Sequence, residues 1–292
     1  MITGTLGIKA DTKKSEIEAY FSKIGNTMKT VKVKLGEILE KNGHYPKVKE
    51  KVEGFIGKIS KIEEGAKKAA LGVSAGGSEV IGSAVKNQNA SPSELQSVKS
   101  LVKGIKEIVE IVLKGRGDGG ADFTKDDSKK DVGKLFTTTD ANRADNAAAQ
   151  AAAASIGAVS GSDILQAIAK SKEDPQVYNT DGIEKAVDAA EIAVAKAVDN
   201  KKEIKEGAQK DAVIAGGIAL RAMAKDGKFA AKQDASDKYA NAVNGVVASA
   251  VSKVLSTLTI AIRNRVDLGL KEINKLLGEI KQGEGSEAKV SE

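Results

Sequence analysis

The chain has 292 residues, of which 41% are hydrophobic but only 3% aromatic, and a core built from Ala, Val, Ile and Leu favours closely packed helices over strands. It contains no Cys and a single His, His44, which excludes disulfides, thiolate metal sites, multi-His metal centres and His-based catalytic triads. The formal net charge is +6, and residues 1–70 carry all of it with 15 Lys against 9 acidic residues, so this region would favour anionic surfaces or glycans unless it is simply a well-solvated helix surface.

Two long helices joined by a short turn are expected at the start of the chain. The first covers about residues 11–41, ends at Asn42-Gly43 and cannot continue past Pro46. The second begins near Pro46 and ends near Gly72. Because the apolar residues of both follow alternating steps of four and three, the pair is predicted to form an antiparallel hairpin. The apolar stripe of the first helix consists of Ile17, Phe21, Ile24, Met28, Val31, Leu35 and Ile38.

The middle of the chain alternates helices with breaks. Ser91-Pro92-Ser93-Glu94 places Ser at the N-cap, Pro at the first helical position and Glu at the third, which predicts a capping box for a third helix that ends at Lys114-Gly115. Residues 115–133 are rich in Gly and Asp and are expected to form a loop. An Ala-dense helix is expected over about 140–171, before the break at Asp174-Pro175, and a further helix over about 181–206.

The last third contains a short apolar segment and the longest helix. Residues 214–232 read Ile-Ala-Gly-Gly-Ile-Ala-Leu-Arg-Ala-Met-Ala-Lys-Asp-Gly-Lys-Phe-Ala-Ala-Lys, a helix of small and apolar residues that is expected to stop at Asp226-Gly227 and to lock the following turn into the core through Phe229. A continuous apolar stripe then predicts a helix over about 234–281, roughly 70 Å long at about 1.5 Å per residue. Such a helix implies an elongated molecule.

These elements together predict an all-α fold. We expect an elongated antiparallel helical bundle in which the long N- and C-terminal helices pack together, with a distal region rich in loops, Ala and Gly. Packed antiparallel, the first and last helices would bring both termini to one end of a rod and leave residues 72–210 toward the other end. Residues 1–282 are predicted to form a single elongated domain, followed by a disordered tail over 283–292.

The segment from Ile214 to Lys232 closely resembles the invariable segment of the Borrelia variable large proteins and of the related variable surface antigen of Lyme spirochaetes. The resemblance continues over residues 239–255, which read Tyr-Ala-Asn-Ala-Val-Asn-Gly-Val-Val-Ala-Ser-Ala-Val-Ser-Lys-Val-Leu. The Ala-rich middle of the chain, including Val187-Asp-Ala-Ala-Glu191, is also similar to the family in composition. Members of this family are outer-surface lipoproteins tethered through a lipidated N-terminal Cys after signal-peptide cleavage. The chain has no Cys and Met1-Ile2-Thr3-Gly4 is not a signal peptide, so we expect the sequence to begin after the lipidation site and to be soluble as given.

The resemblance implies a non-enzymatic antigen of the cell surface, held in the outer membrane by an N-terminal lipid anchor, that evades immunity by antigenic variation. Host antibodies would be its partners. It also implies a frame, residues 11–71 and 211–281, that carries a variable distal part, residues 72–210. The frame residues to which we assign a structural and antigenic role are Ile214, Leu220, Arg221, Met223, Asp226, Gly227 and Phe229.

A second hypothesis is a binding module on the same scaffold that adheres to host glycosaminoglycans, integrins or complement components. It rests on the basic residues 1–70 and on Arg116-Gly117-Asp118, which matches the integrin-binding tripeptide in a loop expected to be flexible. Three residues are a weak signal, because Gly- and Asp-rich loops produce them readily.

The remaining motifs indicate no chemistry. The aspartates of residues 115–133 do not have the spacing of an EF-hand, and Gly115–Gly120 lacks the Gly-Lys-Ser/Thr ending of a phosphate loop. Ser100 and Lys103 have the spacing of some acyl-transfer enzymes but no partner motif. We therefore predict no catalytic residue, no cofactor, no metal site and no nucleic-acid partner, and a monomer or a dimer formed through exposed heptad faces.

Overall fold

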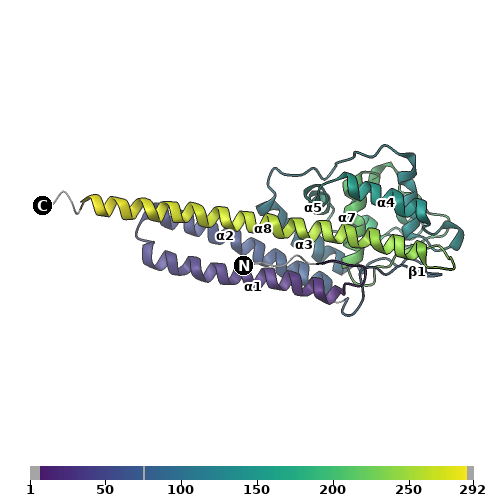
Figure 1. Cartoon of the computed structure of the whole chain (residues 1–292), viewed down its shortest axis with the longest axis horizontal. Helices are drawn as coiled ribbons and strands as arrows, with labels where there is room; N and C mark the ends of the chain where they lie inside the picture. Colours follow the sequence, from purple (N-terminus) through teal and green to yellow (C-terminus); the bar gives the residue numbers. More distant parts are fainter. Residues whose placement is uncertain (1–6, 75, 288–292) are drawn as a thin grey trace.

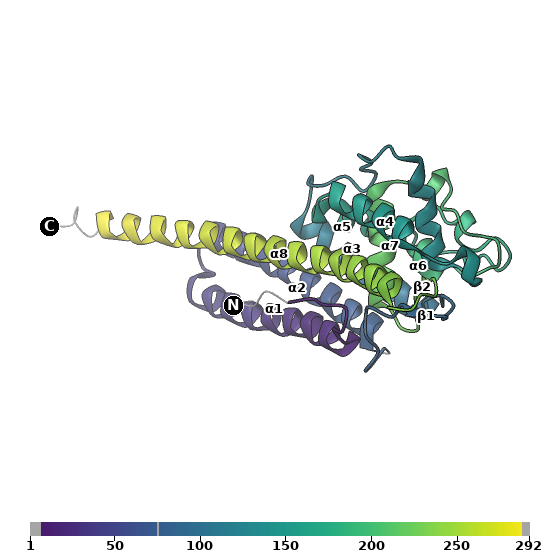
Figure 2. The same cartoon turned by 45° about the vertical axis from the view of Figure 1, so that its right-hand side comes forward.

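The computed structural model describes residues 7–74 and 76–287 and shows an elongated, mostly helical molecule (Figure 1). Three long helices form a narrow rod, α1 (Lys14–Asn42), α2 (Pro46–Ser74) and α8 (Lys238–Glu287), and α3 (Leu95–Val112) packs on α2. A broader head, which we define as residues 115–231, lies beside the first half of α8 (Figure 2). The predicted fold class is confirmed: an elongated helical bundle with a loop-rich distal region.

The remaining elements are short. The two strands pair in parallel, with Val85 opposite Ala230 and Lys86 opposite Ala231, and so join the segment before α3 to the segment before α8. The short elements are β1 (Val85–Lys86) and β2 (Ala230–Ala231), α4 (Asn146–Ala158), α5 (Gly161–Lys170), α6 (Ala189–Val194) and α7 (Asp211–Met223), and the 3-10 helices η1 (Asp127–Phe136), η2 (Asp140–Asn142), η3 (Gly182–Lys185) and η4 (Glu206–Ala208).

The first and last long helices pack together but run in the same direction. The hydroxyl group of Tyr20 in α1 donates to the carbonyl oxygen of Leu255 in α8 at 2.9 Å. Both helices begin at the head, and α8 ends at the opposite end of the rod, which carries the turn between α1 and α2 (Figure 1). The expected antiparallel packing of these two helices, with both termini at one end, is therefore wrong. A heptad stripe is the same in either direction, so the sequence pattern could not decide the orientation.

Glycines let α2 and α3 approach each other closely. A Cβ atom at Gly65 of α2 would lie 2.6 Å from the carbonyl oxygen of Gly104 in α3, and one at Gly104 would lie 2.5 Å from the backbone nitrogen of Ala69. Farther along the pair, the hydroxyl group of Ser97 donates to the carbonyl oxygen of Gly72. The spacing of the two helices therefore depends on positions without a side chain.

The third helix begins later than predicted, because the residues expected to form its first turn make backbone hydrogen bonds to the head instead. The helix starts at Leu95, and the carboxylate of Glu94 accepts the N–H group of Ser97 at 3.0 Å. The N–H groups of Ser93 and Glu94 bond across to the carbonyl oxygens of Ala193 and Lys225 in the head. The capping box predicted at Ser91 is therefore wrong, since tertiary hydrogen bonds hold this segment extended.

Two further helices predicted in the middle of the chain are interrupted. The Ala-dense stretch 140–171 forms α4 and α5, which meet at a bend of 99°, and Ser160 starts α5 by accepting the N–H group of Asp163 at 3.2 Å. The predicted helix 181–206 is reduced to η3, α6 and part of η4. Val187, between η3 and α6, is 45% exposed. The predicted loop 115–133 ends earlier, because η1 begins at Asp127.

The last helix contains a long apolar stretch that is mostly buried. An 18-residue window of α8 reaches a mean hydropathy of 1.7, so α8 is long and apolar enough to be a candidate membrane span, and α4 and α5 together pass the same test as a bent pair. However, 61% of the α8 window is buried inside the molecule, which is the property of a core helix. The helix continues to Glu287, so residues 283–287 of the predicted tail are helical, and residues 288–292 lie outside the described part of the chain.

The close approach of α2 and α3 predicts that a side chain added between them destabilises the protein. We expect Gly65→Ala to lower the free energy of unfolding by about 1–3 kcal/mol, because the added methyl group meets the backbone of α3. Gly57→Ala is the matched control on the same helix: its Cβ atom would have nothing within 4 Å. This change should raise stability by about 0.5–1 kcal/mol through helix propensity. Urea unfolding followed by circular dichroism measures both, and equal effects would contradict the close packing.

Candidate functional site

The helix α7 is enclosed on all sides. All 13 of its residues are buried, and α3, α4, α5, α6 and α8 contact it. Its small residues allow this crowding, since a Cβ atom at Gly216 would lie 3.0 Å from the Cβ atom of Ala189 and one at Gly217 would lie 2.5 Å from that of Ile192. A helix that is apolar all round is a core helix. The sequence-selected residues Ile214, Leu220, Met223 and Phe229 are all fully buried, as their composition indicates.

Arg221, near the C-terminal end of α7, caps the C-terminus of α6. Its Nη1 atom donates to the carbonyl oxygen of Ala195 at 3.0 Å, and to those of Ile192 and Ala193 at 3.3 and 3.4 Å. The last carbonyl groups of a helix have no partner within the helix and favour a cation. The guanidinium shares the last carbonyl groups of α6 with the backbone N–H groups of Ser93 and Ala195, at the point where the helix predicted over 181–206 stops.

The same guanidinium has two aromatic neighbours and no acidic one. Its central carbon lies 4.9 Å from the centre of the Phe136 ring and 5.9 Å from that of Phe229, and its Nε atom donates to the carbonyl oxygen of Lys228 at 3.0 Å. Within residues 7–74 and 76–287, no carboxylate forms an ion pair with Arg221. Burial lowers the pKa of Arg221 to about 9, so the group is still charged at neutral pH. Carbonyl dipoles and ring faces stabilise this charge.

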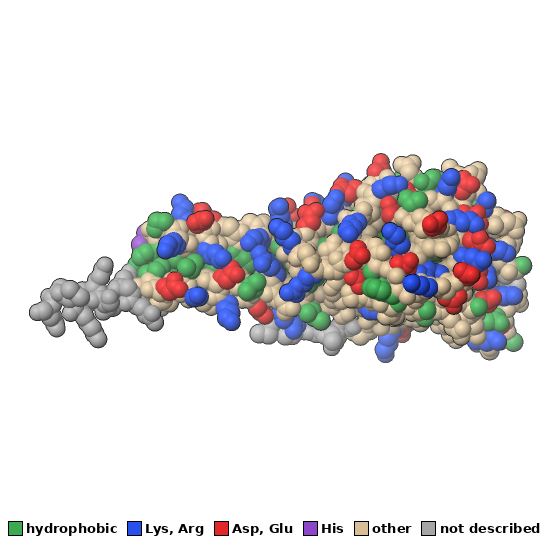
Figure 3. Space-filling model, turned by 90° about the horizontal axis from the view of Figure 1, so that it is seen from above, with side chains coloured by type: hydrophobic (Ala, Val, Ile, Leu, Met, Phe, Trp, Pro, Cys, Tyr) green, Lys and Arg blue, Asp and Glu red, His purple; other side chains and the backbone are tan. Residues whose placement is uncertain are grey.

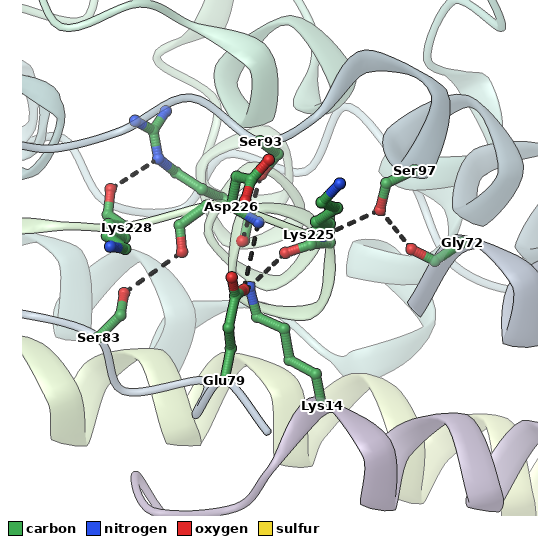
Figure 4. Close-up of polar contacts among 12 residues, drawn as sticks. Lys14, Gly72, Glu79, Ser83, Ser93, Ser97, Lys225, Asp226 and Lys228 are labelled. Carbon is green, nitrogen blue, oxygen red and sulfur yellow. Dashed lines mark hydrogen bonds and ion pairs between the residues drawn. The ribbon is translucent and has the colours of Figure 1, made fainter. Parts of the chain in front are cut away.

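The turn after α7 joins it to the start of α1 (Figure 4). The ammonium group of Lys14 donates to the carbonyl oxygen of Ala224 and lies 2.8 Å from the carboxylate of Glu79, which also accepts the N–H group of Asp226 at 3.2 Å. The Lys14 side chain is 1% exposed, and burial lowers its pKa. Partial burial acts to raise the pKa of Glu79, but the hydrogen bond and charge of Lys14 outweigh it, so the pKa of Glu79 is lowered.

Asp226 and Gly227 shape this turn for different reasons. Asp226 has a φ of 64°, in the left-handed region that Asp tolerates better than most residues. Gly227 is required by a close approach: a Cβ atom there would lie 2.5 Å from the hydroxyl oxygen of Ser93 and would collide with the carbonyl oxygen of Arg221. The predicted turn at Asp226-Gly227 is present, but α7 itself ends three residues earlier, at Met223.

Asp211 fastens the other end of α7 to the chain between α3 and η1. Its fully buried carboxylate accepts the N–H groups of Phe123 and Thr124, both at 2.7 Å, and lies 3.1 Å from the ammonium group of Lys129. Burial acts to raise the pKa of Asp211, but the hydrogen bonds from Thr124 and Phe123 outweigh it, so the pKa is lowered. Both ends of α7 are therefore tied to segments distant in sequence.

The tripeptide Arg116-Gly117-Asp118 follows α3 in the chain and packs against the helix α5. The N–H group of Asp118 donates to the carboxylate of Asp163 at 2.7 Å, and the amide group of Gln166 donates to the carbonyl oxygen of Arg116 at 3.0 Å. Gly117 has a φ of 81°. The flexible loop expected here is thus replaced by backbone fastened to a helix. The three residues lie away from the buried frame residues, and integrin binding stays a prediction.

Sequence analysis missed the polar residues that fasten the buried segment. Lys14 stands three residues before Ile17 on the apolar stripe of α1, and a Lys at a stripe position is the signal that could have marked it. Asp211 lies in the first turn of α7, where an acidic residue looks like an ordinary helix start. Glu79 carries no local signal, because its partners are far away in the chain.

Comparisons with known proteins agree with this architecture. The sequence model of the Borrelia lipoprotein family matches residues 1–277. Variable large protein 17 of Borrelia hermsii is 64% identical over 262 residues, which cover 89% of this chain and 73% of that protein, and variable large protein 4 is 56% identical over 98% of this chain and 81% of its own length. The crystal structure of the Lyme disease variable surface antigen VlsE of Borrelia burgdorferi is similar with a TM-score of 0.78 and 32% identity, covering 92% of this chain and 97% of that one.

The position of Arg221 predicts a large effect of its removal. Arg221→Met keeps the buried volume similar but leaves the carbonyl group of Ala195 without its donor and removes one of the two donors to the carbonyl group of Lys228. We expect a loss of at least about 2 kcal/mol in the free energy of unfolding, the scale for orphaned buried polar groups. Arg116→Met removes an exposed Arg as the control and should stay within about 0.5 kcal/mol of the wild type. Thermal and urea unfolding of both variants and the wild type measure these changes in the free energy of unfolding. A loss in Arg221→Met no larger than that in Arg116→Met would contradict the role of the buried guanidinium.

The ion pair of Lys14 and Glu79 predicts an acid dependence. Because the pKa of Glu79 is lowered in the folded state, its contribution to stability is present above the unfolded pKa and is lost as the pH falls through the folded one. Below about pH 5, the wild type should therefore lose stability more steeply than Glu79→Gln. Urea midpoints measured across this range test it, with the exposed Glu37→Gln as control. A wild type and Glu79→Gln that fall in parallel would exclude the contribution.

Proposed function

The chain belongs to the Borrelia lipoprotein family, with variable large proteins among its relatives, and on this premise we propose that it is a non-enzymatic surface antigen that serves immune evasion by antigenic variation. One member displayed in place of another would present a different surface to host antibodies. An N-terminal lipid anchor would hold it in the outer membrane, as the family description "lipoprotein" suggests.

The observation that carries the proposal is the contrast between α7 and the segments that cover it. Every residue of α7 is buried, whereas the head around it consists largely of short helices and connecting segments with exposed side chains. Exposed connections tolerate substitution because they bury little area. A buried helix tied at both ends can therefore keep the architecture while the surface around it changes.

We propose that the head faces outward, which requires the chain before α1 to run back along the rod toward the anchor, because α1 begins at the head. The head is the broad end of the molecule, and the rod narrows toward the turn between α1 and α2 (Figure 1). A narrow base would leave the head accessible to antibodies on a crowded surface. The frame residues then act in antigenicity indirectly, by holding the exposed segments in place, which deepens the role predicted for Leu220 and Met223.

Antibody mapping tests this division. Antisera raised against the folded protein should lose part of their binding to a variant with Phe123→Ala, Lys125→Ala and Asp127→Ala, three exposed positions of the head, while its melting temperature stays unchanged. A peptide of residues 211–229 should not compete for binding to the folded protein, because that segment is buried except at the turn, but should compete after denaturation. Full competition by this peptide on the folded protein would contradict the proposal.

Display is tested on intact cells. Added protease should cleave the protein on whole spirochaetes without lysis, whereas a periplasmic protein in the same cells stays intact. Resistance of the protein on whole cells, together with cleavage after lysis, would exclude the surface location and with it the proposed function.

A further inference from the structure

An open hollow lies along α8, where α4 packs against that helix. Its volume is about 820 Å³, within the range of roughly 300–1,000 Å³ that ligand sites occupy. A Cβ atom at Gly245 of α8 or at Gly157 of α4 would have nothing within 4 Å, so both positions face open space. We call it the α8 hollow, and α8 lines it mainly with small residues, Ala242, Gly245, Ala248, Ser249, Ser252 and Ser256.

The α8 hollow is apolar and nearly free of charge. Its most buried lining residues, Ile156 and Val246, are 2% and 7% exposed. Among residues 7–74 and 76–287, Lys253 is the only charged residue that lines it, and its ammonium group donates to the carbonyl oxygen of Ile156 at 2.7 Å. Over the face of the head that Figure 3 shows, by contrast, basic and acidic side chains are mixed. The α8 hollow therefore suits an uncharged apolar occupant, and its small residues let a backbone come close.

The chain itself enters the α8 hollow at Ile8. This side chain lines the hollow, is partly buried and packs against the core. The backbone just after it is held in place, because the carbonyl oxygens of Ala10 and Thr12 accept the N–H groups of Gly82 and Ile81, at 2.9 and 3.0 Å. The residues that precede Ile8 are thus attached at the hollow, where a short connection gives them a high effective concentration.

The first residues of the chain have the composition and the length to fill the α8 hollow. Residues 1–8 read Met-Ile-Thr-Gly-Thr-Leu-Gly-Ile, with apolar side chains at the even positions 2, 6 and 8 and no charged side chain. In an extended segment, side chains at alternate positions point to the same face. Residues 1–6, which lie outside the described part of the chain, could span about 20 Å when extended, and α8 covers about the same distance from Ala242 to Ser256.

We propose that residues 2–6 dock in the α8 hollow as an extended strap, with Ile2 and Leu6 against its buried apolar residues and Thr3 and Thr5 toward solvent. A second copy of the chain or a free ligand would have to compete with a segment that is already attached at the hollow. The docking does not depend on the proposed function, but its consequence does. An anchored chain would reach the molecule on the surface of α8, the helix that runs from the head down the rod, before it reaches the start of α1 (Figure 1).

The test uses single thiols, because the chain contains no Cys. Leu6→Cys places the thiol on the docked face of the strap, and Thr5→Cys places it on the solvent face. Gly245→Trp fills the α8 hollow, and Gly278→Trp is the matched control, since both glycines are exposed on α8 and a Cβ atom at either would have nothing within 4 Å. The rate of alkylation by iodoacetamide is measured on the full chain in native buffer and divided by the rate in urea. Circular dichroism confirms that each variant is folded.

The thiol of Leu6→Cys should react at least about tenfold more slowly than that of Thr5→Cys, since a docked segment is open no more than about a tenth of the time. Adding Gly245→Trp should restore the rate, and adding Gly278→Trp should leave it slow. Equal rates for the two thiols, or a protection that Gly245→Trp does not remove, would overturn the proposal. A protection that grows with protein concentration would overturn it as well, because the segment would then occupy the hollow of a second copy.

Discussion

A charged guanidinium buried without a carboxylate is the interaction on which the head depends. Arg221 brings together the end of α6, the turn after α7 and the rings of Phe136 and Phe229. The end of α6, Phe136 and the turn that carries Lys228 and Phe229 come from three separate parts of the chain, and contacts with Arg221 bring them together. Without Arg221 the carbonyl group of Ala195 would have no donor, and those of Ile192, Ala193 and Lys228 would keep only a backbone donor each.

The polar contacts at the two ends of α7 extend this arrangement to the rest of the molecule. Asp211 holds the segment before η1, and Lys14 with Glu79 holds the start of α1 against the end of α7. The apolar length of α7 contributes burial, which is non-directional, while the charged groups at its ends decide which segments meet it. In the rod, the absence of side chains at Gly65 and Gly104 determines where α2 and α3 meet.

This construction suits the function proposed for a member of the Borrelia lipoprotein family. The residues that maintain the architecture lie inside, and the exposed side chains of the head stand on short helices and connecting segments. Antigenic change would then act on side chains that contribute little to folding.

The sequence by itself determined the all-α class, the α1–α2 hairpin, the long last helix and the buried character of the segment from Ile214, because each depends on the local spacing of apolar residues or on Gly and Pro. It could not decide the direction of α8 relative to α1, since a heptad stripe reads the same both ways. It also missed the cap at Glu94, the bend between α4 and α5 and the early end of α6. The extended segment before Glu94 and the end of α6 involve hydrogen bonds between residues far apart in the chain, such as Glu94 with Lys225 and Arg221 with Ala195. The start of α5, by contrast, is a local bond between Ser160 and Asp163. Only the tertiary structure brings such partners together, because a buried polar group takes the nearest partner in space, wherever that partner lies in the sequence.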